Sequence, residues 1–97
     1  MAQLIAPGTT ESAWTDFEVD GTPAALFIKP ATGSDQPPPA GVKFVLAHKT
    51  GDGDYIALVT LHAGNILDHG LVAGNGTYGV KRLASNESAG MDVEGAV

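Results

Sequence analysis

The sequence predicts an all-β fold, a single antiparallel β-sandwich of about seven short strands with an extended N-terminal arm. Three observations support this: the apolar residues alternate in short runs, turn signals recur about every ten residues, and no segment keeps a helical period beyond two turns. A chain of 97 residues forms one domain. We assign residues 1–12 to the arm and 13–97 to the sandwich. The absence of cysteine excludes a disulfide-pinned immunoglobulin domain but leaves immunoglobulin-like and jelly-roll-like arrangements open.

The first part of the chain is predicted to contain an arm and two strands. Residues 1–12 show no period of 2 or 3.6, and Pro7-Gly8 interrupts any element there. Its apolar front, Leu4-Ile5, is expected either to fray or to dock on a neighbouring chain. Residues 13–19 alternate as a half-buried strand, and residues 24–29 are expected to pair with them as a hairpin through the turn at 20–23.

The strongest local pattern is a hairpin over Val42–His62, where two apolar runs flank the segment Thr50-Gly-Asp-Gly-Asp54. Because nearly every position on both faces is apolar or small, we expect a central hairpin and not a sheet edge. One face, grouped as Tyr55, Val59, Leu61, Val45 and Ala47, holds more apolar surface than a small sandwich needs to bury. We therefore expect part of this face, or the sheet edge beside it, to pack against another chain.

A proline-rich connection precedes the hairpin, and three short strands follow it. Pro37, Pro38 and Pro39 predict a polyproline rod, either a stiff crossing between sheets or a contact loop. The later strands are expected at residues 66–68, 77–83 and 91–94, separated by Gly/Asn turns and a polar loop.

Composition limits the partners and the compartment. The chain carries 11 acidic and 5 basic residues, a net charge of −6, and the cations are scattered. Nucleic acid is therefore not an expected partner, because phosphate binding needs clustered Lys and Arg. No stretch has the length of a bilayer-crossing helix, and residues 1–7 do not resemble a signal peptide, so we expect neither membrane association nor export. The 16% charged residues are few for a free domain, which usually has about a quarter, and this favours a chain packed against others.

The histidines do not form a metal site by spacing. His48 and His62 are expected near opposite ends of the hairpin. His62, Asp68 and His69 could approach one another across a short turn, but zinc needs three or four ligands at close distance, and nothing else completes the set. Hydrogen-bonded turn histidines are the expectation, with no metal and no cofactor.

The acidic residues show no catalytic arrangement either. Gly51-Asp-Gly-Asp54 resembles a fragment of a calcium loop, but it has too few oxygen ligands, and hairpin chemistry explains it; weak calcium binding stays open. The pairs Asp16/Glu18, Asp52/Asp54 and Asp92/Glu94 are expected at solvated positions. No serine lies in a nucleophile elbow. We expect a protein that is not an enzyme.

The aromatic residues suggest one exposed anchor. Phe17, Phe27 and Phe44 lie in strand centres and are expected in the core. Trp14 shares a face with Asp16 and Glu18, so it is covered by the arm or placed at an interface, where aromatic anchors dominate binding energy.

Five short motifs resemble parts of small structural proteins of tailed bacteriophages, over roughly residues 13–94. They are DFEVDG, the A-x-L-F-I-K-P strand, YIALVTL, the GTYGVKRL strand and AGMDV. The resemblance implies a β-sandwich virion protein, a capsid decoration or cement protein on the capsid surface, made in the host cytoplasm. Its implied partners are the major capsid protein and further copies of itself, as a dimer or trimer. It brings no catalytic residues.

On this hypothesis the contacts would come from three places in the chain. The expected interface residues are Leu4, Ile5, Trp14, Pro37, Pro38, Pro39 and Tyr55. The alternatives are a tail, neck or fibre module, or a surface glycan-binding module, which would need a cluster of exposed aromatic rings.

Overall fold

The structure is a computed structural model that describes residues 2–30, 40–62, 69–72 and 74–95. In these residues the chain forms eight β-strands and no helix. The strands are β1 (Ala2–Gly8), β2 (Thr15–Val19), β3 (Ala24–Pro30), β4 (Lys43–Lys49), β5 (Tyr55–His62), β6 (His69–Val72), β7 (Gly76–Arg82) and β8 (Ala89–Glu94). The all-β prediction is confirmed. β1 and β6 were not expected as strands, and the strand expected at residues 66–68 lies outside the described residues.

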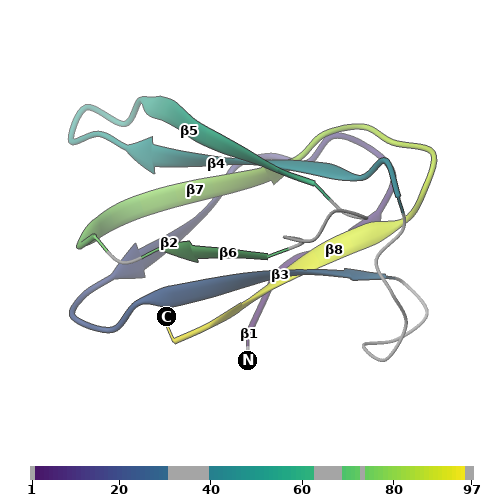
Figure 1. Cartoon of the computed structure of the whole chain (residues 1–97). Coiled ribbons are helices and arrows are strands. Elements are labelled where there is room, and N and C mark those ends of the chain that lie inside the picture. Colours follow the sequence, from purple (N-terminus) through teal and green to yellow (C-terminus); the bar gives the residue numbers. More distant parts are fainter. Residues whose placement is uncertain (1, 31–39, 63–68, 73, 96–97) are drawn as a thin grey trace.

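The strands form two antiparallel four-stranded sheets that pack face to face (Figure 1). The first sheet has the order β1-β8-β3-β6 and the second the order β2-β7-β4-β5. Strands β1, β2, β3 and β4 therefore pair with β8, β7, β6 and β5 in turn, as in one long hairpin wound into a sandwich. This order is that of a jelly roll, the second of the two arrangements that the sequence left open.

The expected hairpin between residues 13–19 and 24–29 is wrong. β2 pairs with β7 in one sheet, and β3 pairs with β8 and β6 in the other. The segment 20–23 is a corner between sheets, where Gly21 has a φ of 84° and donates its N–H to Asn75 Oδ1 at 2.9 Å. Turn residues predict a change of direction, but the pairing of the next strand depends on contacts far along the sequence.

The core lies between the sheets and is built from the inward positions of each strand. Its largest fully buried side chains are Phe44, Leu26, Met91, Val42, Val80 and Val93. Phe17 and Phe44 belong to the core as expected. Phe27 does not: it is half-buried on the outer face of β3, between the buried Leu26 and Ile28.

The segment expected to be a free arm is an edge strand of the first sheet. β1 pairs with β8, but the register shifts between Gln3 and Ile5 and again between Ile5 and Gly8, which explains the missing period of two. Ile5 is only 5% exposed and lies in the core of its own chain, and Leu4 packs against that core. Ile5 is therefore not available to a neighbour in this fold, which corrects its assignment to an interface.

Arg82 at the end of β7 holds β1 and the following loop in place. Its side chain is inside the fold, with the residue 6% exposed. The guanidinium donates to the carbonyl oxygens of Thr10 at 2.8 Å, Ala6 at 2.7 Å and Ala89 at 3.0 Å. Its backbone N–H also donates to the Ser12 hydroxyl at 2.8 Å. One buried cation thus connects β7 with β8, β1 and the β1–β2 loop.

Candidate functional site

The most exposed apolar side chains of the described residues lie on one strand, β5. Ile56 is 56% exposed, Leu58 55% and Val59 47%. We call these three residues the β5 patch. Among the described strands, β5 is the outer strand of the second sheet and pairs only with β4, so the expectation of a central hairpin is wrong for this strand. Side chains that would normally be buried are therefore presented at a sheet edge.

A β-bulge at Leu58 sets the direction of these side chains. Leu46 pairs with Val59 and Ala47 with Ala57, so Leu58 is the extra residue of β5. Paired residues share a face, so Val59 and Leu61 follow the inward Leu46 and Phe44. The face expected from sequence, which joined Val59 and Leu61 to Tyr55, is therefore split by the bulge.

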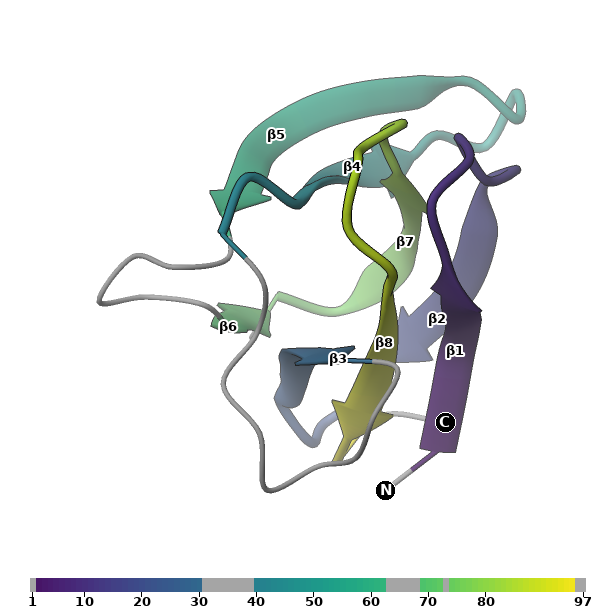
Figure 2. The same ribbon diagram turned by 90° about the vertical axis from the view of Figure 1, so that its right-hand side faces the viewer.

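Ile56 and Val59 of the β5 patch lie on the inner side of the second sheet, but the first sheet leaves them exposed. Leu61, near the end of β5, is buried at 7% exposure, whereas residues 56–59 are exposed. Figure 2 shows why: β6 lies below the end of β5, and the rest of β5 arches away from it toward the β4–β5 turn. β6 has only four residues, too few to cover the eight of β5.

Trp14 and Tyr55, both expected at an interface, meet on the outer face of the second sheet. Their rings are stacked, with centroids 4.4 Å apart and planes 6° apart. Both rings stand over Gly79 of β7: a Cβ there would collide with the Tyr55 ring and lie 3.2 Å from Trp14 Cε3. Gly79 is therefore required for close approach of the rings.

Two lysines cover the outer faces of this ring pair. Lys81 Nζ lies 5.0 Å from the centroid of Trp14, and Lys49 Nζ lies 5.5 Å from that of Tyr55. The space between the stacked rings is too narrow for an ammonium group, so each lysine lies on the far side of its ring. A sugar that stacks on either ring would therefore have to displace an ammonium group.

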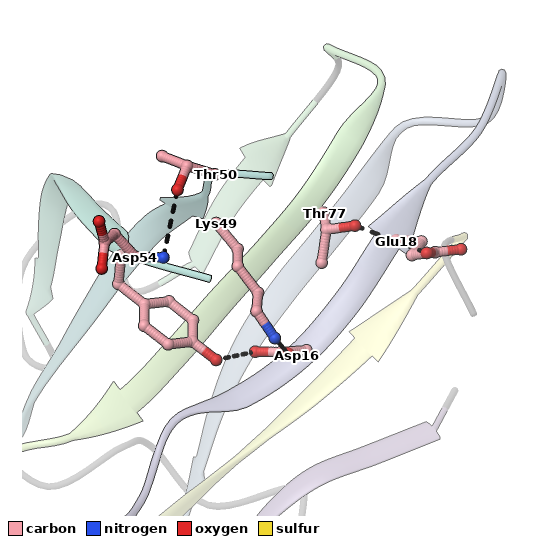
Figure 3. A network of polar contacts seen from close by, with 7 residues as sticks. Asp16, Glu18, Lys49, Thr50, Asp54 and Thr77 are labelled. Atoms are coloured by element: carbon pink, nitrogen blue, oxygen red, sulfur yellow. Dashed lines mark hydrogen bonds and ion pairs between the residues drawn. The ribbon is translucent and has the colours of Figure 1, made fainter. Parts of the chain in front are cut away.

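Asp16 of β2 organises the polar contacts around the ring pair (Figure 3). Its carboxylate accepts from Lys49 Nζ at 2.7 Å and from the Tyr55 hydroxyl at 2.6 Å. The hydrogen bond from Lys49, and then that from Tyr55, lower the pKa of Asp16. The same contacts with Asp16 raise the pKa of Lys49 and that of Tyr55. Asp16 therefore stays ionised and links β2 to β4 and β5.

This arrangement does not support acid–base catalysis. A general acid or base needs a pKa near the working pH, and the shift of Asp16 moves it further away. The neighbouring Glu18 accepts a long bond of 3.5 Å from Thr77. A shallow groove runs along these side chains toward His48, and it is open to solvent. The carboxylate pair Asp16/Glu18 is thus occupied by contacts within the sheet.

The Gly-Asp segment is a hairpin turn, as the sequence indicated. Thr50 N donates to Asp54 O at 2.8 Å, Asp54 N donates to Thr50 Oγ1 at 3.1 Å, and Gly53 N donates to Thr50 O at 3.0 Å. Gly53 has a φ of 91°, which favours glycine. Asp52 and Asp54 lie exposed on this turn and bring two negative charges to the tip of the hairpin.

The remaining candidate residues are placed only in part. His48 and His62 lie at opposite ends of the β4–β5 ladder, as expected. Asp68 and Pro37–Pro39 fall outside the described residues, so the metal hypothesis and the contact loop stay predictions. Within residues 2–30, 40–62, 69–72 and 74–95, no three His, Cys, Asp or Glu side chains lie together as a metal site would need. Asp92 forms an ion pair with Lys29 at 2.8 Å.

Two functional features escaped the sequence reasoning. The stack of Trp14 on Tyr55 depends on Gly79, and a glycine inside an alternating strand was a usable signal of close approach. The exposed run of β5 depends on the bulge and on the short β6, for which no local signal exists. Within the described part of the chain, no helix has the length and hydropathy to cross a membrane.

The site thus combines an exposed apolar edge strand on a jelly roll with an outer face that carries stacked aromatic rings and paired charged side chains. Comparison of the chain with protein-family models, with curated proteins and with solved structures found no match.

Proposed function

We propose that this chain is a non-enzymatic structural protein of a tailed-bacteriophage virion, a decoration protein that binds the capsid surface and stabilises contacts between capsid subunits. The observation that carries the proposal is the β5 patch, because three large apolar side chains at an exposed sheet edge need a protein partner to leave water. The major capsid protein and further copies of this chain are the proposed partners.

Two further observations support this reading. The jelly roll is a common fold of viral capsid proteins, although fold alone does not define function. The chain also has few charges for its size, 16% of its residues, which suits a protein that is covered on several sides.

The alternative of a glycan-binding module is less well supported. The stacked Trp14 and Tyr55 cover each other on one side and are covered by lysines on the other. A tail, neck or fibre module uses the same physical properties as a decoration protein, and location in the particle separates the two.

The direct experiment uses particles made with and without this chain. We expect the protein to sediment with tailless heads, and heads without it to release their genome at a lower temperature. Adding the purified protein back should restore the heat resistance. Heads that are equally heat-stable and complete without it would contradict the proposal, and sedimentation with isolated tails would favour the tail alternative.

A further inference from the structure

The free edge of β5 has an unusual composition for an exposed strand. From Tyr55 to His62 it contains no Lys, Arg, Asp, Glu or Pro. Sheet proteins usually place charges or proline on such an edge, because its unpaired N–H and C=O groups would otherwise recruit another strand. The bulge at Leu58 is the protective feature of this strand, and it places Ile56 and Val59 on the same face. The bulge therefore brings apolar side chains together and does not shield them from another chain.

We infer that the β5 edge packs against β5 of a second copy, antiparallel across a twofold axis near Leu58. The inference rests on the proposed function, because both use β5 as a contact surface. It adds that a second copy of this chain binds there. With the axis at this position, Leu58 of one copy lies closest to Leu58 of the second copy. An apolar side chain of the β5 patch that is 55% exposed in the single chain thus meets its own copy at the axis.

Charge favours a second copy in this orientation. Each chain carries a net charge of −6, so two copies repel unless the contact is neutral or complementary. β5 is neutral along its length, and antiparallel pairing brings the acidic turn of one copy, Asp52 and Asp54, to the opposite end of the other β5. There Asp54 lies beside His62, and the exposed Lys43, paired with His62 in β4, is one strand further away. Neighbouring strands are about 4.8 Å apart, so a lysine side chain spans that gap.

A parallel arrangement would do the opposite. It would place the two acidic turns next to each other. It would also leave the end of each hairpin that carries Lys43 and His62 without an acidic partner. The charge pattern therefore selects the antiparallel pairing. The resulting dimer has a continuous sheet of eight strands, four from each copy. It also presents two identical copies of every other surface, so that weak binding to a shell of repeated subunits gains avidity.

The experiment uses sedimentation of the purified full chain and one engineered cysteine. We expect the wild type to be dimeric at tens of micromolar, a usual range for such measurements, and Leu58→Lys to weaken dimerisation at least about tenfold. The matched control is Thr22→Lys, which adds the same charge at an exposed position in the corner at residues 20–23, outside β5, and should leave the dimer intact. Circular dichroism checks that both variants are folded. A wild type that is monomeric at all concentrations, or a Leu58→Lys variant that dimerises like wild type, would overturn the inference.

The register has its own test, because the chain contains no cysteine. Leu58→Cys should form a disulfide-linked dimer under mild oxidation, since residue 58 meets itself at the axis. Thr60→Cys should not, because its copy lies several residues away. A protein that dimerises through β5 but does not cross-link at position 58 would overturn the proposed register. A protein that is monomeric but still binds capsids would overturn the dimer and leave the proposed function standing. A protein that dimerises through β5 but does not bind capsids would overturn the proposed function and leave the dimer standing.

Discussion

Replacing Arg82 with methionine tests how the N-terminal strand is held. The substitution keeps a long side chain and removes the three hydrogen bonds to the carbonyls of Thr10, Ala6 and Ala89. Ala89 is buried, and the residue opposite it in β3 is Pro30, which has no N–H to donate. Loss of a hydrogen bond from a charged donor costs about 1.5–3 kcal/mol. The cost is lower at Ala6 and Thr10, because these residues are exposed and water can donate to their carbonyl oxygens in place of Arg82. We expect a total loss of about 2–4 kcal/mol in the free energy of unfolding.

Urea unfolding followed by circular dichroism measures this loss, and for a domain of this size it corresponds to a fall in Tm of roughly 10–30 °C. Arg82→Lys should recover only part of it, because one ammonium group cannot reach three carbonyls that the flat guanidinium spans. The matched control is Lys81→Met, on the neighbouring residue of the outer face, which should change stability by less than about 1 kcal/mol. If Arg82→Met were as stable as Lys81→Met, the role of Arg82 in holding β1 would be refuted.

Three further predictions concern the second sheet. Gly79→Ala should separate Trp14 from Tyr55 and change the fluorescence of Trp14, the single tryptophan, whereas Gly51→Ala, which meets no atom within 4 Å, should leave it unchanged. In a Tyr55→Ala background the effect of Gly79→Ala should largely vanish, and a full effect there would argue against the collision. Asp16 should titrate below its ordinary pKa by NMR, and Lys49→Met should raise it; an unchanged midpoint would mean that the bond is absent in solution. Because the pKa of Asp16 is lowered on folding, its contribution to stability is present above about pH 3.9, the usual carboxyl pKa, and is lost as the pH falls through the depressed value.

Local patterns in the sequence were sufficient for the strands and for the β4–β5 turn. The alternation of Phe17 and Val19 with Asp16 and Glu18 is present in β2, and the Thr50–Asp54 segment closes by its own hydrogen bonds. These features depend on neighbours in the chain, so a pattern of a few residues contains the necessary information.

The pairing of strands was less predictable, because it depends on distant residues. Nothing near the corner at residues 20–23 indicates that β2 pairs with β7 and β3 with β8. Likewise β1 lacks alternation because its ladder to β8 is irregular, and it is held by Arg82, more than 70 positions away. A buried arginine satisfied by carbonyl oxygens leaves no pattern in a single sequence.

In the candidate site, too, the local features were predictable and those that depend on distant residues were not. Trp14 and Tyr55 were identified as unusual aromatic residues, but their stacking depends on Gly79 between them. The apolar excess of β5 was also predicted, but on the wrong face, because the bulge at Leu58 reverses the alternation for Val59 and Leu61. One inserted residue exchanges the faces of a strand, and only the register reveals it.

The central claim is that β5 is a protein contact surface, and amide hydrogen exchange of the full chain tests it most directly. We predict that the amides of β5 exchange more slowly as the protein concentration rises, and more slowly again on capsids, while those of β8, paired on both sides, do not change. Exchange of the β5 amides at the rate of a free sheet edge, in concentrated solution and on capsids alike, would contradict the account.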